Sequence, residues 1–543
     1  MLLSLYYNTI YAQTPKCKWA NSAYGEYHDR ATSVKTDKSG NVYIAGHFYS
    51  SELIFDTITL VNNGSSGSND IFLVKYNSDG DLLWAKNFGN TSMDQANAIA
   101  IDSIGNIYIT GSFIGETITF DSITISSNGW NEVYIVKLNS SGDVIWAKSA
   151  GGSRTDIGKS IATDNSGNVY VTGVFGSTVM YFESDSLLSF TGYPGPPYDI
   201  FFSKYDSNGN LVWIKRIGGN GDDDSFSVSS DNNGNIYLAG SFYSSALYFE
   251  SDSIEKQYGQ SDFYIIKYSS LGNVDWANSG GGDSTDIATS VVADNLGNVY
   301  LGGCYKSPIF YYNGNVLINE NSYTSDIFTI KYSHSGIPIW GNSIGMYDNE
   351  YLNSLSIGPS ESVILSGYFV SNSIVFGLDT LKNQGSSDIL LVCYNNDGSP
   401  SWSKSIGNVE SESCNSVFYD QFDNLYIAGY YLSPTLAFDS IILTNSYYMD
   451  LFVAKLNCLP IGIETYEKPS LISMYPNPSS SYLSIELPLN SELEIINLHG
   501  KIIRRLLADS ETITIDISGL SKGLYILNIT SDNKTITKKI IKQ

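Results

Sequence analysis

Positive charge and histidine are scarce in this sequence, and each scarcity excludes a class of function. The chain has 30 Lys and Arg against 55 Asp and Glu, and residues 1–470 hold 22 of the former against 48 of the latter, a charge of about −26. A surface of this sign without a basic stripe repels polyanions, so we expect no nucleic-acid partner. The 4 histidines stand at unrelated positions, without the paired spacing of a zinc site (His28, His47, His334 and His499).

Catalytic motifs are also sparse, and long hydrophobic runs are missing. No glycine-rich phosphate loop occurs, and we expect no enzyme activity and no cofactor. The apolar run from Met1 to Ala12 is too short to span a bilayer, which takes about 20 apolar residues, and no other segment comes close. Its small last residue predicts a signal peptide over residues 1–13. Because no Lys or Arg precedes the run, we expect a truncated start; a disordered apolar N-terminus is the alternative.

Residues that suit strands and turns are abundant and occur in a repeat. The chain has 41 Tyr, 23 Phe and 49 Gly but only 16% charged residues, as is typical of an all-β protein. Four apolar or alternating segments occur in each unit, for example at 98–102, 105–111, 133–138 and 143–148. Seven tryptophans follow one another at intervals of 65, 62, 67, 63, 64 and 62 residues (Trp19, Trp84, Trp146, Trp213, Trp276, Trp340 and Trp402). Four strands per unit predict a seven-bladed β-propeller over residues 14–457.

Composition within a unit predicts where its strands A to D lie. Strand A is rich in Ala, Ser, Thr and Asn, so we expect it to crowd the propeller axis, where side chains have little room. The repeated Trp belongs to the outer strand D and should fill the gap between blades, whereas Trp130 lies outside the repeat and is expected to be exposed. A Lys recurs in strand C, with its stem packed and its head reaching water or a carboxylate (Lys75, Lys137, Lys204, Lys267, Lys331 and Lys455).

These units resemble the SBBP β-propeller repeat. Its pattern of D-x-x-x-x-K, W-A, D-x-A and D-x-x-G-N-V-Y-x-x-G is matched from Asp70 to Gly111 and six more times, over roughly residues 16–457. The resemblance implies the propeller fold. It says almost nothing about function, because propellers host binding modules and enzymes alike.

The two ends of the repeat region predict how the ring closes. The first unit has no strand C before Trp19, and the last unit ends at Leu456 without a Trp strand. We therefore expect the N-terminal segment around Trp19 to supply strand D of the last blade.

Five cysteines are present, and two of them flank this closure. Superposing the composite blade on the second-repeat hairpin places Cys17 and Cys458 on opposite sides of a tight turn. An exported protein meets oxidising conditions, so we predict a Cys17–Cys458 disulfide; two unpaired cysteines are the alternative. The other three fall inside strands and are expected to be buried free thiols (Cys304, Cys393 and Cys414).

Two sets of carboxylates recur in every unit, on connections that leave the sheets on the same face. One set opens strand A (Asp29, Asp94, Asp156, Asp223, Asp286, Glu350 and Glu412) and the other opens strand C (Asp70, Glu132, Asp199, Asp262, Asp326, Asp388 and Asp450). Each carboxylate either accepts backbone N–H groups of its own loop or belongs to an acidic rim that binds Ca²⁺, a cation or a polyhydroxylated ligand. A rim this wide holds Ca²⁺ weakly at most, and seven equal positions argue against catalysis.

After a linker at 458–472, residues 473–543 alternate short apolar strands with turns and predict a small antiparallel sandwich. Landmarks of this segment resemble the type A sorting domain of type IX secretion cargo in the Bacteroidota (Pro476, Asn477, Pro478, Gly500, Gly523, Tyr525, Lys538 and Lys539). The resemblance implies recognition by the type IX secretion machinery and a location that is secreted or anchored at the outer surface.

Between strands B and C each unit inserts a segment that we expect to form a hairpin turning at Asp-Ser or Asp-Thr. Six of these tripeptides resemble the Asp-Ser/Thr-apolar acceptor of O-glycosylation in the same bacteria (Thr57, Ser122, Ser186, Ser253, Thr380 and Ser440). The resemblance implies glycosylation; plain turns are the alternative.

Alike blades and an export signal favour a non-catalytic binding or adhesion protein, expected to be a monomer whose ligand is an unidentified glycan, protein or other surface molecule. The alternative is a secreted polysaccharide lyase or glycosidase with its carboxylates in the least regular units. Those units are the third, with its insertion at 193–198, and the fifth and sixth.

Overall fold

In the computed structural model the described residues are 14–64, 67–190, 197–257, 259–319, 321, 324–457, 474–475, 478–486, 491–497, 501–508, 510, 512–531 and 534–543. The chain divides into two compact units, residues 1–461 and 462–543. Each unit is described by itself below.

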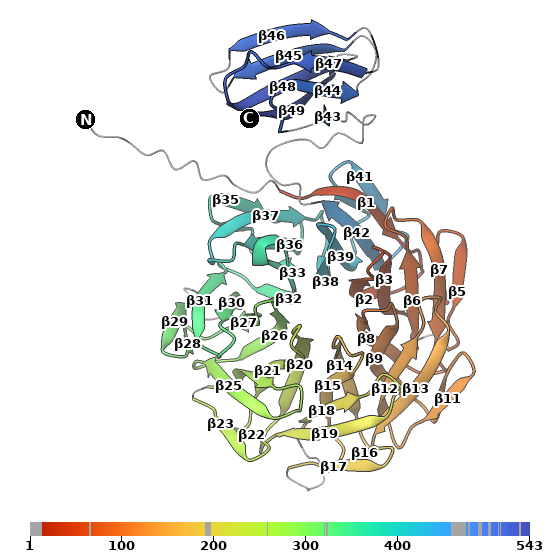
Figure 1. Ribbon diagram of the computed structural model, residues 1–543. Helices are drawn as coiled ribbons and strands as arrows, with labels where there is room; N and C mark the ends of the chain where they lie inside the picture. The colour runs from red at the N-terminus through yellow and green to blue at the C-terminus, as the bar shows by residue number, and fades with distance from the viewer. Residues whose placement is uncertain are drawn as a thin grey trace. The chain divides into compact units, whose positions relative to one another are not determined.

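The first unit is a ring of antiparallel sheets, or blades, each with four strands in the order A-B-C-D from the axis outward (Figure 1). In three of them a hairpin of the following blade pairs with strand D and extends the sheet to six strands. Blade I contains β2 (Asp29–Thr36), β3 (Val42–Phe48), β6 (Asp70–Tyr76) and β7 (Leu82–Phe88). Blade II contains β8 (Asp94–Ile101), β9 (Ile107–Ile114), β12 (Asn131–Leu138) and β13 (Val144–Gly151). Blade III contains β14 (Asp156–Thr163), β15 (Val169–Phe175), β18 (Asp199–Tyr205) and β19 (Leu211–Gly218). Blade IV contains β20 (Asp223–Ser230), β21 (Ile236–Phe242), β24 (Asp262–Tyr268) and β25 (Val274–Gly281).

The remaining blades follow the same order. Blade V contains β26 (Asp286–Ala293), β27 (Val299–Tyr305), β30 (Asp326–Tyr332) and β31 (Pro338–Ile344). Blade VI contains β32 (Glu350–Ile357), the 3₁₀ turn η1 (Pro359–Glu361), β33 (Val363–Phe369), β36 (Asp388–Tyr394) and β37 (Pro400–Ile406). Blade VII contains β38 (Glu412–Tyr419), β39 (Asn424–Tyr431), β42 (Asp450–Asn457) and, as its strand D, the N-terminal β1 (Lys16–Ser22). The predicted closure is confirmed, because β1 pairs antiparallel with β42 and Trp19 lies opposite Lys455.

A hairpin is inserted between strands B and C of every blade. The hairpins are β4 (Glu52–Phe55) with β5 (Ile58–Val61), β10 (Thr117–Phe120) with β11 (Ile123–Ser126), β16 (Val179–Phe182) with β17 (Asp185–Leu188), β22 (Ala246–Phe249) with β23 (Asp252–Glu255), β28 (Ile309–Tyr312) with β29 (Asn315–Ile318), β34 (Ser373–Phe376) with β35 (Asp379–Lys382), and β40 (Thr435–Phe438) with β41 (Ile441–Thr444).

The predicted hairpin turns are correct in blades I, II and VII and wrong in III, IV and VI. In blade I the turn is Asp56–Thr57, but in blade III it is Glu183–Ser184, and Asp185 already begins the return strand. In both cases the turn directly follows a buried aromatic side chain, Phe55 or Phe182. The buried ring therefore sets the register, because a one-residue slip would turn it to solvent.

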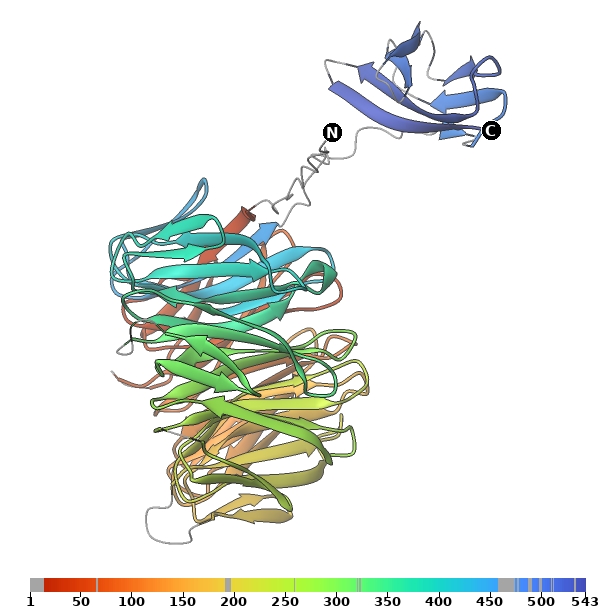
Figure 2. The ribbon, with the colours of Figure 1, turned by 90° about the vertical axis from the view of Figure 1, so that its left-hand side faces the viewer.

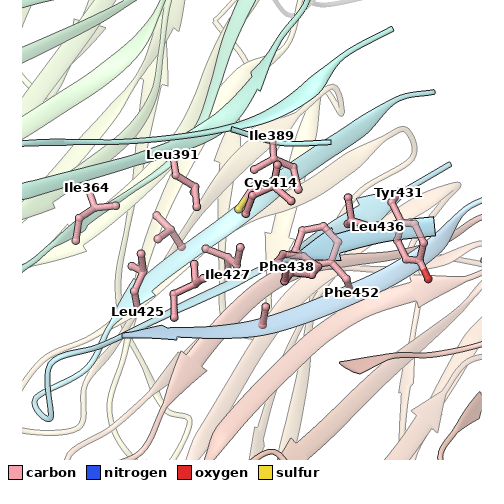
Figure 3. Packing of buried hydrophobic residues seen from close by; sticks show 14 of the residues in the cluster. Ile364, Ile389, Leu391, Cys414, Leu425, Ile427, Tyr431, Leu436, Phe438 and Phe452 are labelled. Carbon is pink, nitrogen blue, oxygen red and sulfur yellow. The ribbon is translucent and has the colours of Figure 1, made fainter. Parts of the chain in front are cut away.

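Hydrophobic side chains are buried at the seams between blades, one cluster per seam. Figure 3 shows the seam between blades VI and VII, where Ile389 and Leu391 of β36 face Ile427 of β39 and Phe452 of β42. In the side view the blades lie face to face with their strands stacked in layers (Figure 2). Each blade is thus buried on both faces, which explains why strands B and C are buried and largely apolar apart from the carboxylate and the lysine of strand C.

The cysteine predictions have mixed outcomes. Cys304, Cys393 and Cys414 are buried free thiols, as predicted. Cys17 is also a free thiol here, and its S–H donates to the carbonyl of Trp19 (3.3 Å). Its predicted partner Cys458 lies outside the described residues, so the disulfide stays a prediction.

The second unit contains two antiparallel sheets, as the predicted sandwich requires. One consists of β43 (Met474–Tyr475), β44 (Tyr482–Glu486) and β47 (Thr512–Asp516); the other of β46 (Ile502–Leu507), β45 (Glu492–Asn497), β48 (Gly523–Ser531) and β49 (Lys534–Lys542). Apolar residues of both sheets form one buried cluster. Strand β46 was not predicted, because its sequence runs Ile-Ile-Arg-Arg-Leu-Leu without alternation and it is mostly exposed.

Candidate functional site

The D-to-A and B-to-C connections share one face of the propeller, here called the loop face, and the A-to-B and C-to-D turns share the opposite turn face. All fourteen recurrent carboxylates lie at the loop-face ends of strands A and C, but they are buried: Asp326 is the most exposed of them at 6%. The expected solvent-facing acidic rim is therefore corrected to a ring of buried groups.

These carboxylates hold their own loops, which is the first of the two interpretations of their sequence pattern. Asp286 accepts bonds from the backbone N–H of Gly282 (2.8 Å), Lys306 (3.1 Å) and Ser307 (3.2 Å) and from the Ser307 hydroxyl (2.6 Å). The other members with a loop N–H donor are Asp29, Asp94, Asp156, Asp223, Glu350 and Glu412 of the first set and Asp70, Glu132, Asp199, Asp262, Asp388 and Asp450 of the second.

Sequence reasoning missed the serine that completes each clamp. In six blades a Ser stands 21 residues after the first-set carboxylate, and its backbone N–H or hydroxyl donates to that group, as Ser177 does to Asp156 (hydroxyl, 2.8 Å). The members are Ser50, Ser177, Ser244, Ser307, Ser371 and Ser433. The constant spacing was visible in the sequence. Blade II has Gly115 at this position.

Burial raises the pKa of thirteen of these carboxyl groups, and in six pairs of neighbouring blades the charge of one carboxylate raises the pKa of the other. The pKa of Asp94 rises to about 7 through burial and the charge of Asp70. Burial and the nearby Asp223 likewise raise the pKa of Asp199 to about 7. The loop N–H donors counteract this rise, so the two effects compete at every seam.

At the axis a second repeated device joins the A strands. Each A strand has a bulge, and the bulged residue in five blades donates to a backbone carbonyl of the next blade; Thr32, for example, donates to Ala96 (2.9 Å). The other four bonds run from Asn97 to Gly158, Thr289 to Leu352, Asn353 to Cys414 and Asn415 to Ala31. Small polar residues are thus favoured in strand A for a second reason besides the limited space. Their side chains hydrogen-bond neighbouring blades to each other around the channel.

The outer tryptophans and strand-C lysines form a third device. Trp19 Nε1 and Lys455 Nζ both donate to the carbonyl of Ser78 in the C-to-D turn of the next blade (3.1 and 2.9 Å). The lysines were expected to reach water or carboxylates, and Lys267 does pair with Asp275 (3.3 Å). All six also reach a backbone carbonyl of the next blade (Lys75, Lys137, Lys204, Lys267, Lys331 and Lys455). Residues that recur in all blades therefore serve assembly, and a ligand site is to be sought where the repeat is broken.

Blades III and IV break the repeat at the axis. Their bulged residues are Lys159 and Phe226. Phe226 has no side-chain donor, and Lys159 pairs with Asp224 (3.3 Å) and lies over the Phe226 ring (5.2 Å from its centroid). The channel itself is a cavity of about 360 Å³ lined by strand-A residues of all seven blades. A lysine, a carboxylate and an aromatic ring thus meet where the A strands of blades III and IV adjoin, and a second lysine, Lys35, lies over the Phe418 ring elsewhere in the channel (4.7 Å from its centroid).

Blade III also breaks the repeat on the loop face. The residue directly before the carboxylate that opens strand C is Asn, Ser or Met in the other blades, but it is Tyr198 in blade III. The residue directly before the clamp serine, or before Gly115 in blade II, is larger than glycine in the other blades, but it is Gly176 in blade III. A Cβ on Gly176 would lie 2.9 Å from Cε1 of Tyr198, so only glycine leaves room for this ring. The tyrosine at position 198 therefore depends on the glycine at position 176.

Exposed aromatic side chains are distributed unequally between the two faces. On the loop face they are Tyr24, Tyr27, Trp130, Tyr198, Tyr243, Tyr347, Tyr447 and Tyr448. On the described A-to-B and C-to-D turns the one exposed Phe, Tyr or Trp side chain is Phe422. Trp130 is 69% exposed, as predicted from its place outside the repeat. Exposed aromatic residues are enriched where proteins bind ligands, so the loop face is the candidate binding face.

Two adjoining hollows of the loop face share Tyr198. The first, of about 340 Å³, is lined by Trp130, Ser153, Arg154, Thr155, Gly176 and Tyr198. The second, of about 330 Å³, includes Tyr198, Tyr243, Phe226, Lys159, Asp222 and Asp224. We call the two together the aromatic groove. It lies in the third unit and its neighbours, and the insertion of that unit had marked it as irregular.

The residues predicted for modification and sorting have these positions. All six candidate glycosylation residues are exposed (Thr57, Ser122, Ser186, Ser253, Thr380 and Ser440). In the second unit Gly523 opens β48, the Tyr525 hydroxyl donates to the carbonyl of Ser521 (2.9 Å), and Pro478, Lys538 and Lys539 are exposed. Pro476, Asn477 and Gly500 lie outside the described residues.

Comparison with known proteins supports both parts of the chain. Residues 473–543 match the secretion system C-terminal sorting domain, and residues 83–112, 145–174 and 212–241 match the SBBP β-propeller repeat. The chain is a secreted β-propeller protein with a type IX sorting tail. The tail indicates secretion or attachment at the outer surface and implies interaction with the type IX machinery. Among the described residues, no helix is long and apolar enough to cross a membrane.

More distant likenesses are to parts of two larger curated proteins and to a solved structure. The uncharacterized WD repeat-containing protein L264 of Acanthamoeba polyphaga mimivirus is 24% identical over 67% of this chain and 32% of that protein. Regulatory protein FlaEY of Caulobacter vibrioides is 25% identical over 26% of this chain and 15% of that protein. The chain thus spans a third or less of the curated relatives it matches. PorZ, a surface component of the type IX secretion system of Porphyromonas gingivalis, is a solved structure with 9% identity and a TM-score of 0.15, covering 96% of this chain and 100% of that one.

Proposed function

We propose that this secreted propeller is a non-catalytic binding protein and that its loop face contacts the ligand. The observation that carries the proposal is the separation of residues by role. Side chains that recur in all blades are buried and join loops or blades, whereas exposed Tyr and Trp side chains gather on the loop face. A site assembled from connections between rigid strands is a common arrangement for binding proteins.

The carboxylates of the aromatic groove support a binding role over a catalytic one. Asp224 forms an ion pair with Lys159, and Asp222 accepts a bond from the backbone N–H of Tyr198 (2.9 Å). Asp223 between them is buried and holds Ser244 (2.6 Å to its hydroxyl). Glycosidases need two carboxyl groups with distinct environments facing one bond. Here each carboxylate already has a structural partner.

A pull-down with the full chain tests the proposal. Immobilised protein is offered polysaccharides, matrix proteins and bacterial envelopes, and the retained material is analysed for chemical change. We expect retention without turnover, lost in a loop-face variant (Tyr27→Ala, Tyr198→Ala, Tyr243→Ala and Tyr448→Ala together). A matched outer-wall variant with three exposed hairpin tyrosines replaced (Tyr181→Ala, Tyr248→Ala and Tyr311→Ala) should bind normally.

Two results would contradict the proposal. Loss of binding in the outer-wall variant alone would move the contact surface away from the loop face. Turnover of a retained polysaccharide, abolished by Asp222→Asn or Asp224→Asn, would show a lyase or glycosidase instead.

A further inference from the structure

We propose that the aromatic groove binds a neutral oligosaccharide. This inference rests on the proposed binding function and names the site and the ligand class within the loop face. The groove runs from Trp130 past Tyr198 to Phe226 at the channel mouth.

The shape of the groove suits an extended ligand of several units. Its two hollows adjoin at Tyr198, and each lies in the size range of small-ligand sites, about 300–1,000 Å³. Tyr198 is 40% exposed and Tyr243 44% exposed, so both rings present a face to solvent without local unfolding. The other blades have a larger residue at the position of Gly176, so the space that Tyr198 occupies is found only in blade III.

The charges of the groove argue against an ionic ligand. A cation would be attracted by the rings and by Asp222 and Asp224, but Lys159 already lies over Phe226 and pairs with Asp224. An anion would meet these carboxylates on a unit that carries a large negative charge. Two cationic side chains, Arg154 and Lys159, stand against the carboxylates of Asp222 and Asp224 along the groove, so the two signs of charge are balanced and a neutral ligand meets the smallest penalty.

Neutral sugars match the remaining chemistry. A pyranose ring has an apolar C–H face that packs on Tyr and Trp rings, whose polar atoms can also take part in hydrogen bonds. Its hydroxyl groups both donate and accept, so they can bond the carboxylate of Asp222 and the ammonium of Lys159 at once. A chain of such units would place alternate apolar and polar groups along the groove.

The second aromatic group of the loop face fits this role less well. Tyr27 and Tyr448 stack on each other with ring planes at 10° and centroids 6.2 Å apart. Their mutual contact uses ring faces that a sugar would need. They therefore serve as an internal comparison on the same face.

Binding of defined oligosaccharides to the full chain tests the inference. Neutral oligomers of hexoses and pentoses are compared with uronic-acid, sulfated and chitosan oligomers by calorimetry and by tryptophan fluorescence, for which Trp130 is the exposed reporter. We expect a neutral oligomer to bind best and to change the fluorescence, and Trp130→Phe to remove that change. Tyr198→Ala and Tyr243→Ala should each weaken binding about tenfold or more.

Matched variants separate the possible failures. Tyr181→Ala removes a ring of similar exposure (53%) on the outer wall and should leave the affinity within about twofold. Binding lost in Tyr27→Ala or Tyr448→Ala but kept in Tyr198→Ala would overturn the groove while leaving the loop face as the binding surface. Preference for charged oligomers, or retention of a peptide ligand with no sugar bound, would overturn the ligand class. Loss in Tyr181→Ala alone would overturn the proposed function as well.

Discussion

Asp286 and Asp94 occupy the same position in blades V and II but have different partners. Asp286 accepts bonds from three backbone N–H groups and a hydroxyl, whereas Asp94 accepts from the N–H of Asn90 (2.6 Å) and its Oδ1 is buried without a hydrogen-bond partner. Gly115 of blade II replaces the serine that the other blades use here. The same residue type therefore contributes differently to stability.

We expect Asp286→Ala to lower the free energy of unfolding by about 3 kcal/mol, because several buried donors lose their acceptor at once. Asp94→Ala should cost about 1 kcal/mol or less, since it releases one donor and removes a carboxyl oxygen that has no partner. Chemical denaturation of the two variants measures the difference. Equal losses would show that hydrogen bonding of the loop is not what these carboxylates provide.

At the scale of the element, the C-to-D turns pack on the tryptophan of the preceding blade. Gly336 has φ +79, and a Cβ there would lie 2.7 Å from Trp276. Gly314, in the hairpin of blade V, has a nearly identical φ of +80 but no atom within 4 Å. The two glycines separate the cost of backbone conformation from the cost of the inter-blade contact.

Gly314→Ala should therefore lower stability by about 1 kcal/mol, the usual cost of a left-handed conformation for alanine. Gly336→Ala should cost 2 kcal/mol or more, because Trp276 must also move. Thermal melting of both variants checks this ordering. A Gly336→Ala loss no larger than that of Gly314→Ala would mean that the turn is free to shift away from the ring.

For the whole molecule, the buried carboxyl groups predict an unusual pH dependence. Their pKa values are raised by burial, to about 6 in Asp70 and about 7 in Glu132, above the roughly 4 of an unfolded chain. Between these values the folded protein binds more protons than the unfolded one, so stability is highest near pH 4 and falls as pH rises through 7. His47 acts in the opposite direction, because burial and the charge of Arg30 lower its pKa to about 4, but it is a single group.

The melting temperature should accordingly be several degrees higher at pH 5 than at pH 8. Asp70→Asn with Asp94→Asn removes one neighbouring pair and should reduce the difference. Calorimetric scans across this range provide the measurement. A melting temperature that rises between pH 5 and pH 8 would show that the loop N–H donors outweigh burial.

Because the chain forms two compact units, we expect the propeller to fold without the sorting domain but not to be exported without it. Deleting residues 473–543 should leave a folded propeller, because the ring is closed by β1 and β42 and its clusters contain no residue of the second unit. The truncated protein should stay inside the cell, since the sorting domain is lost. Circular dichroism of the purified fragment and immunoblots of cell and supernatant fractions test both parts. Efficient appearance in the supernatant would contradict the role of the tail.

The predicted disulfide concerns the same closure. Cys17 lies opposite Leu456, two residues before Cys458 in the sequence. If the bond forms on export, it should stabilise the ring by a few kcal/mol, and Cys17→Ser should lower the melting temperature only under non-reducing conditions. Peptide mapping without reductant provides the direct measurement. Free thiols at both positions of the exported protein would end the idea.

The sequence by itself determined the repeat, the closure by β1, the packing of the recurrent tryptophans between blades and the presence of a sorting tail, because each depends on periodic residues or local motifs. Only the tertiary structure decided what the recurrent polar residues do. The carboxylates that open strands A and C could face solvent or their own loops, and nothing local distinguishes these outcomes. Their burial, the bonds of Thr32 and Lys455 to the next blade, and the meeting of Trp130, Tyr198 and Lys159 in one groove depend on how neighbouring blades pack.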